Sequence, residues 1–500
     1  MALRSLLFLI NLLLIYWCLG PVGNLSGLII SDGAIPVIMS NEAELSPYHL
    51  YYFGQDRLGA WPYIILFFFT KVFSFSIEPA SLFFLQALFF SASSLLLLRL
   101  FPKNPAVPIF FVIAGLLHPV SMHFFLAIAH PYAASLCMLA CFWSLRIASS
   151  KKHEVPGFLL SALYLSCFLA MWTSPSVVIF LLMIHWFEKR PLFLHSAKKS
   201  LQLIFYSIPL VGLCGERILR FIYENHVNSE YFFQLENYHF RVKTDTSILL
   251  NDFFSNCFEN FRILFDGHSY FTYLYCALSF LLLLHYFCSI KFREFIGRSF
   301  INRCAIIFVS ITLTTILFST INWVRIHHHP LRYHVPQLVL MNLASLLMAG
   351  RYLSFFARKF RRGHYLETIV ALSMIIFMAS KYQNLGQRMS AYGKLKSEAQ
   401  QIAGNFDRLV VLDTYSKTYI WQAFAPNRII AQPIEQNNTR IPWTPRELKP
   451  GIPVLSCYQF GKNEFFQFGK QLRFEKNLNL KTKCAYKLYK VVNEEISAAP

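Results

Sequence analysis

Long apolar runs separated by short polar segments recur along the first 380 residues, and many approach the roughly 20 residues that a helix needs to cross a bilayer. The first run, about 5–22, follows Arg4 and lacks a small-residue cleavage site, so we expect a retained span rather than a signal peptide. Later runs predict spans near 79–98, 106–126, 131–148, 156–174, 176–187, 200–216, 269–289, 303–320, 336–350 and 365–380. The pattern therefore predicts a mainly α, polytopic helical membrane protein with about eleven spans.

A polar and aromatic segment, about 23–78, separates the first two spans. Its run Trp61–Phe75 is apolar but short and contains Lys71, so it could cross the membrane or lie at its surface. We favour an interfacial helix, because the basic loops then all fall on the side of the N-terminus, as the positive-inside rule requires. The predicted cytoplasmic loops are 99–103, 146–152, 188–199, 291–303 and 351–362.

The C-terminal region, 381–500, differs from the membrane part (1–380), and the odd span count places it outside. Short β-like runs predict a small extracytoplasmic α/β domain, with strands at 409–412, 428–430, 453–455 and 486–492 and a helix at 415–424. Cys457 and Cys484 could form a disulfide or remain free thiols. A large outside loop is expected at 217–268.

Composition supports this architecture. Of 500 residues, 55% are hydrophobic and only 14% are charged, whereas a soluble chain carries about 25% charged residues. The net charge of +20 lies mostly in short loops, where topology and contact with membrane lipids explain it better than nucleic acid does. Eleven cysteines show no metal-ligand spacing.

Candidate chemistry gathers on the predicted outer face. Asp32 comes soon after the first span, and Asp56 and Arg57 follow among glycines and aromatic residues. A carboxylate at a membrane surface suits a general base. The alternative is that these acids are solvated loop residues or helix caps.

A second candidate is the segment 322–336, which opens a late span. Arg332 at a helix start suits a phosphate group, because guanidinium and backbone N–H groups would both face it. The consecutive His327–His329 do not have the spacing of metal ligands. His123 and His130, near the outer surface, could line the same cavity as Asp32.

The pattern resembles the C-type (GT-C) membrane glycosyltransferases, in a branch of uncharacterised bacterial proteins. Asp32 matches the acidic residue that follows their first span, and 61–75 matches their interfacial helix. The sequence ArgTyrHisValPro at 332–336 resembles their Arg-Tyr-x-x-Pro element, and 409–424 is similar to the start of their outside domain. The family's usual acidic pair is absent, since Gly33 follows Asp32, and His130 stands where many members have an acid.

This resemblance implies transfer of a sugar from a polyprenyl-phosphate donor to a glycan, lipid or protein acceptor at the outer face of a bacterial inner membrane. It implies the following roles: Asp32 as general base with Asp56 second, Arg332 on the donor phosphate with Arg57 as helper, and Tyr51, Tyr52, Trp61, His123, His130 and Tyr333 lining the substrate. No cofactor is assigned, and a divalent metal has no support in the sequence. A transporter or flippase, and a non-catalytic membrane protein, remain the alternatives.

Overall fold

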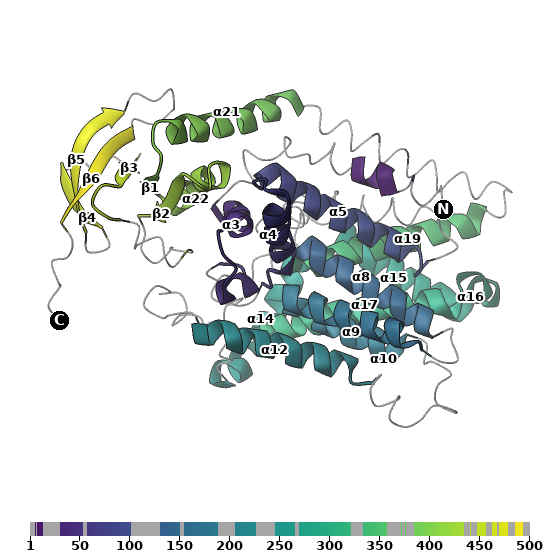
Figure 1. Ribbon diagram of the computed structural model, residues 1–500. Coiled ribbons are helices and arrows are strands. Elements are labelled where there is room, and N and C mark those ends of the chain that lie inside the picture. The colour runs from purple at the N-terminus through teal and green to yellow at the C-terminus, as the bar shows by residue number, and fades with distance from the viewer. Residues whose placement is uncertain are drawn as a thin grey trace.

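The protein folds as a bundle of helices with a β-sheet region at one end (Figure 1). In this computed structural model the described residues are 6, 8–13, 31–53, 58–101, 131–150, 155–188, 206–226, 246–265, 270–321, 334–357, 372, 376, 385–434, 441, 448–456, 463–467, 470–478 and 486–493.

The described bundle helices are, in chain order, α5 (Pro79–Leu97), α8 (Tyr132–Ser149), α9 (Gly157–Thr173), α10 (Val178–Phe187), α12 (Ile208–His226), α14 (Thr246–Phe265), α15 (Tyr270–Cys288), α16 (Ile290–Ile296), α17 (Arg298–Ser319) and α19 (Val335–Ala357). Most of them lie on the predicted apolar runs, but α14 and α16 lie in predicted loops, and α17 and α19 extend into the predicted loops 291–303 and 351–362. Part of the first span is also described, where the Asn11 Nδ2 donates a hydrogen bond to the Ser94 Oγ of α5 at 2.8 Å.

Three described helices, α5, α8 and α17, are long and apolar enough to cross a membrane. A fourth crossing is possible if α15 and α16, bent by 116° at their junction, form one broken span. The chain is thus an integral membrane protein. The prediction of eleven spans stays untested, since 106–126 and nearly all of 365–380 lie outside the described residues.

Helix α12 corrects one predicted boundary. The expected span 200–216 was followed by a loop, but α12 begins at Ile208 and continues to His226. Glu216 and Arg217 therefore lie within a helix, not at its end, and the Arg217 Nε lies 3.7 Å from the Glu216 Oε2. Helix α14 makes a further part of the expected loop 217–268 helical. The helix α12 was predicted to end where its polar residues begin, because hydropathy does not reveal the partners of these residues on the same helix and on neighbouring segments.

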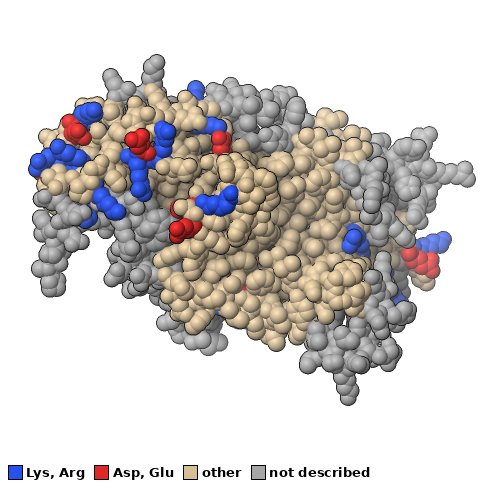
Figure 2. Space-filling model, viewed as in Figure 1, with Lys and Arg blue, Asp and Glu red and all other residues tan. Residues whose placement is uncertain are grey.

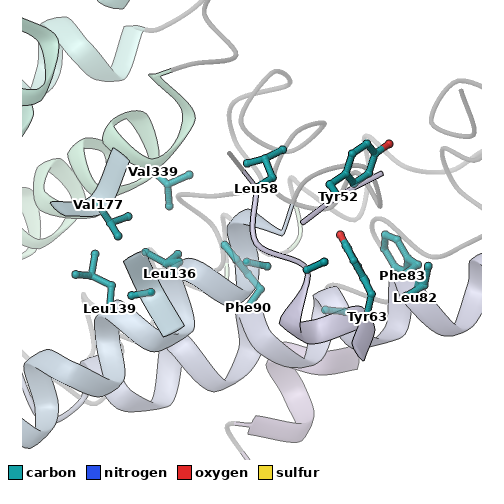
Figure 3. Packing of buried hydrophobic residues seen from close by; sticks show 14 of the residues in the cluster. Tyr52, Leu58, Tyr63, Leu82, Phe83, Phe90, Leu136, Leu139, Val177 and Val339 are labelled. Atoms are coloured by element: carbon teal, nitrogen blue, oxygen red, sulfur yellow. The ribbon is translucent and has the colours of Figure 1, made fainter. Parts of the chain in front are cut away.

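The segment before α5 packs onto the bundle. It contains α3 (Ser31–Asn41), the short 3₁₀ helix η1 (Pro47–Leu50) and α4 (Trp61–Phe73). Figure 3 shows Tyr52, Leu58 and Tyr63 of this segment in one buried cluster with side chains of α5 and α8. At about 1.5 Å per residue, the 13 residues of α4 cover about 20 Å, less than the roughly 30 Å hydrocarbon core. This length suits the interfacial helix, whose position in the membrane stays a prediction.

The C-terminal region contains a six-stranded sheet in the order β2-β1-β3-β6-β5-β4. The strands are β1 (Leu409–Asp413), β2 (Ile429–Pro433), β3 (Pro453–Ser456), β4 (Glu464–Gln467), β5 (Lys470–Leu478) and β6 (Tyr486–Asn493). Strand β1 pairs in parallel with β2 and β3, and the remaining pairs are antiparallel. The helix α22 (Tyr415–Phe424) connects β1 to β2, and α21 (Leu385–Gly404) precedes the sheet. The predicted strands and helix all form, while β4, β5 and α21 are additional.

Charge is distributed unevenly over the surface. Figure 2 shows Lys, Arg, Asp and Glu side chains gathered over the C-terminal sheet region and few on the broad visible face of the bundle. Large apolar side chains are exposed on the bundle instead, including Phe158 of α9 and Phe280 and Phe287 of α15. Such extensive exposed apolar surface is expected of helices that face lipid.

Candidate functional site

The structure describes only some of the predicted site residues. Asp32 lies in the first turn of α3, but its side chain is outside the described part. The other charged and His candidates, and Tyr333, also lie outside the described residues: Asp56, Arg57, His123, His130, Arg332 and Tyr333. The site can therefore be built from the elements that hold these residues, and from Tyr51, Tyr52 and Trp61.

A closed backbone neck holds the segment that carries Asp56 and Arg57. Tyr51 and Gly59 form an antiparallel bridge, and the Tyr52 N–H donates to the Leu58 carbonyl at 2.9 Å. The chain thus enters and leaves the four residues 54–57 at fixed points.

The neck is attached to the end of α9 through Trp172. The Gly59 N–H donates to the Trp172 carbonyl at 2.9 Å, and the Trp172 Nε1–H donates to the Leu50 carbonyl at 2.9 Å. A Cβ atom at Gly59 would lie 2.2 Å from the Trp172 carbonyl oxygen, so the close approach requires glycine.

Glu216 of α12 binds the neck from the other side. The Tyr51 hydroxyl donates to Glu216 Oε1 at 3.3 Å, and the Arg220 Nη2 donates to the same oxygen at 2.9 Å. Burial raises the pKa of Tyr51, and the nearby Glu216 carboxylate raises it further. Tyr51 therefore remains a neutral hydrogen-bond donor, and Glu216, which is 2% exposed, is held by charge and hydrogen bonding together.

The three predicted aromatic residues are buried parts of this packing. Tyr51 and Tyr52 are 0% and 1% exposed, and Trp61 is 7% exposed with its Nε1–H donating to the Thr173 hydroxyl. The ring of Tyr51 lies 5.1 Å from that of Tyr223 in an edge-on contact. In this structure Tyr51 and Trp61 hold the first segment to α12 and α9, Tyr52 belongs to the buried core, and stacking on a sugar stays a prediction.

A second polar network lies beside the Arg332 segment. His334, two residues later and fully buried, has its Nε2 3.2 Å from the Asn260 Oδ1 of α14. The Asn260 Nδ2 donates to the Ser319 hydroxyl at the end of α17, at 2.8 Å. These contacts connect the start of α19 to α14 and α17, and so fix the chain two residues after Arg332.

Glu42, just after α3, is a carboxylic acid that the sequence analysis did not single out. Burial raises its pKa to about 7, although the Ala43 backbone N–H and Lys71 lower it. A carboxyl group with a pKa near 7 can exchange protons at physiological pH, a common property of functional sites. Only its partial burial distinguishes it from the exposed Glu44, and burial was not visible in the sequence.

The opposite end of the bundle holds a different charged cluster. Glu188, after α10, accepts hydrogen bonds from the Trp143 Nε1 at 2.6 Å and the Arg303 Nη2 at 3.3 Å. The Arg146 Nη2 donates to the Glu188 carbonyl at 3.4 Å. Three helix ends that the charge pattern assigns to the cytoplasmic side therefore meet. Which side of the membrane this is stays a prediction.

Metal binding finds no support in the described part of the chain, which contains no group of three His, Cys, Asp or Glu side chains able to hold an ion. The predicted Cys457 and Cys484 lie outside it.

Comparison with known proteins extends the assignment of the fold. No protein-family model matches the sequence, and no curated protein matches it. The structure is similar to the crystal structure of ArnT from Cupriavidus metallidurans bound to undecaprenyl phosphate, with a TM-score of 0.51 and 10% identity over 90% of this chain and 92% of that chain. The chain has the GT-C fold.

A further similar structure is the oligosaccharyltransferase AglB from Archaeoglobus fulgidus in complex with an inhibitory peptide and a dolichol-phosphate. Its TM-score is 0.43, with 11% identity over 91% of this chain and 69% of that chain. The resemblance to GT-C glycosyltransferases stated from the sequence is confirmed at the level of the fold by the ArnT comparison. Within this GT-C chain, the roles of individual residues remain predictions.

Proposed function

We propose that this protein is a membrane glycosyltransferase that moves a sugar from a polyprenyl-phosphate carrier to an acceptor at the outer face of the membrane. The observation that carries the proposal is the GT-C fold, which matches ArnT over nearly the full length of both chains. ArnT was crystallised with undecaprenyl phosphate, a carrier of the proposed chemical class.

The arrangement of the first segment supports the proposal. The helix α3, which contains Asp32 in its first turn, and the neck around residues 54–57 are both packed on the bundle. Fixed backbone is what a general base needs, because proton transfer requires contact at about 3 Å with the attacking hydroxyl. Asp32 serves as the base and Asp56 is the second choice.

The donor phosphate needs a cation near the lipid surface. Arg332 fills this role, supported by the attachment of His334, two residues later, to α14. Arg57, on the segment between Tyr51 and Gly59, is the helper. A guanidinium group can contact two phosphate oxygens at once, which fixes the donor's orientation as well as its charge.

The test is transfer from labelled polyprenyl-phosphate hexoses and pentoses by the purified protein in lipid nanodiscs. We expect turnover with one of these donors, and a loss of about 10²- to 10⁴-fold in Asp32→Asn, the usual contribution of a general base. The variant should keep the thermal unfolding midpoint of the wild type. Full activity in Asp32→Asn would disprove Asp32 as the base, and Asp56→Asn tests the second choice. Absence of turnover with every donor would count against the function.

A further inference from the structure

In α3, the helix that carries Asp32, residues 33–40 are all buried. The apolar side chains of Ala34, Ile35, Val37, Ile38 and Met39 are at most 1% exposed, and Ser40 is fully buried. A helix that is buried all round depends on every neighbour for its position. Two of its neighbours belong to the membrane bundle side, and one belongs to the C-terminal region.

On the bundle side, α3 packs against α4 and α5. The Asn41 side chain at its end donates to the Ile77 carbonyl and accepts from the Ile77 N–H, both at 2.8 Å. The Thr70 hydroxyl of α4 also donates to the Ser40 carbonyl at 3.2 Å. These bonds fix the C-terminal end of α3 to the chain that leads into α5.

On the other side, α22 of the C-terminal region packs against α3, and Figure 1 shows the two helices side by side. Tyr419, Ile420 and Ala423 of α22 belong to the same buried cluster as Ile35 and Ile38 of α3. The apolar core of the bundle therefore continues through α3 into the C-terminal region.

A polar clamp beside this contact connects α21 to the same stretch of chain. The Lys396 Nζ donates to both carboxylate oxygens of Glu78, at 2.6 and 2.8 Å, and the Tyr392 hydroxyl donates to Glu78 at 3.5 Å. The Tyr392 ring lies 5.2 Å from the Phe424 ring of α22. Glu78 follows Ile77, so Asn41 and the clamp hold neighbouring residues.

We propose that the C-terminal region positions α3, so that α22 and the clamp of Lys396, Tyr392 and Glu78 hold the Asp32 helix in place for transfer. Lys396, Tyr392 and Glu78 are positioning residues, since they act through α3 and not on the substrate. The catalytic part of this inference rests on the proposed function, whereas the control of α3 does not.

The experiment uses charge reversal in the full-length protein. The variants are Lys396→Glu, Glu78→Lys and the double variant that carries both substitutions. Hydrogen–deuterium exchange of residues 31–41 is compared with exchange of α8. We expect hydrogen exchange in α3 to accelerate about 3- to 10-fold in each single variant. Exposed ion pairs contribute about 1 kcal/mol to stability, and about 1.4 kcal/mol changes an equilibrium constant tenfold. Hydrogen exchange in α8 should not change, and the double variant should restore the protection of α3.

Arg473→Glu is the matched control, because Arg473 pairs with Glu464 at comparable exposure within the sheet, away from α3. It should leave exchange in α3 unchanged. Transfer assays on the same proteins should show a lower kcat with an unchanged KM for the donor in the single variants. The kcat should recover in the double variant.

Unchanged exchange in α3 of Lys396→Glu and Glu78→Lys would overturn the positioning role, whatever the enzyme activity. A response of α3 to both single variants, with rescue by the double variant, supports it even if no donor is turned over. Absence of turnover with every donor would count against the proposed function alone, so the two proposals can fail separately.

Discussion

Gly59 is the residue at which the first segment comes closest to the bundle. A methyl group there would collide with the Trp172 carbonyl oxygen, so Gly59→Ala forces the neck away from α9. We expect a loss of about 1–3 kcal/mol in unfolding free energy, as in other overpacked cores, together with reduced transfer. Thermal unfolding in detergent measures the first effect. Gly157→Ala at the start of α9 is the control, because nothing lies within 4 Å of its added Cβ; equal behaviour of the two variants would contradict the close contact.

Glu42 predicts a pH-dependent stability. Its pKa is raised from 4.5 to about 7 in the folded protein, so the folded state binds a proton that the unfolded state releases between these values. Stability therefore falls as pH rises through this window, and the whole penalty is present above about pH 7. Glu42→Gln should remove the penalty and unfold at higher temperature than the wild type at pH 8, but not at pH 4. The effect is at most about 3 kcal/mol.

Unfolding scans at both pH values decide this prediction, with the exposed neighbour Glu44→Gln as control. A gain in Glu42→Gln that is the same at pH 4 and pH 8 would exclude titration of Glu42 as its cause.

Single residues could be predicted from the sequence only when their type and local context were informative. Asp32 was predicted in the outside loop after the first span, as a general base or a helix cap, whereas it lies in the first turn of α3, a helix that the sequence analysis did not predict. Glu216 and His334 could not be assigned roles, since their partners lie 165 and 74 residues away in the chain. The buried faces of Tyr51 and Trp61 are also a product of tertiary packing.

At the scale of elements, Glu216 connects α12 to the neck. Replacing it by Gln keeps its size and an oxygen that can accept from Tyr51, but removes the negative charge that holds Arg220. We expect a loss of roughly 1.5–3 kcal/mol, the range for hydrogen bonds to charged groups. Chemical unfolding of the purified protein measures it.

The matched control is Glu259→Gln on α14, where Glu259 forms an exposed pair with Arg262 three residues along the helix. This variant should change stability by less than about 1 kcal/mol. A similar loss in both variants would mean that the network around Glu216 contributes no more than a surface pair.

The elements differ in how well the sequence predicted them. Helices α5, α8, α9 and α15 agree with the apolar runs within two residues, because long apolar helices have a strong and uniform hydropathy signal. Strands β4, at the edge of the sheet, and β5, beside it, were missed because their residues are largely polar and exposed. Helix α12 was misplaced where its ion pairs begin.

At the scale of the whole molecule, the two ends of the bundle carry different elements and different charged residues. One end carries α3, the neck and the C-terminal sheet, and the other carries the Arg146–Glu188–Arg303 cluster and the α16 helix (Figure 1). The sequence predicted this separation from the positions of Lys and Arg alone, because the charge rule is a property of the whole chain. It could not predict that α22 packs on α3, since no local pattern encodes contacts between distant segments.

The separation predicts the orientation of the protein in the membrane. Gly451 and Gly297 both lie in turns with positive φ, 87° and 78°, and neither has atoms within 4 Å of an added Cβ, so each tolerates a short inserted protease site. Gly451 precedes β3, and Gly297 lies between α16 and α17 at the other end of the bundle. Protease added to intact spheroplasts should cut the chain at Gly451, and should cut at Gly297 only after the membrane is permeabilised. Cleavage at Gly297 in intact spheroplasts would place the basic loops outside, and would move the Asp32 helix to the face where the proposed acceptor is absent.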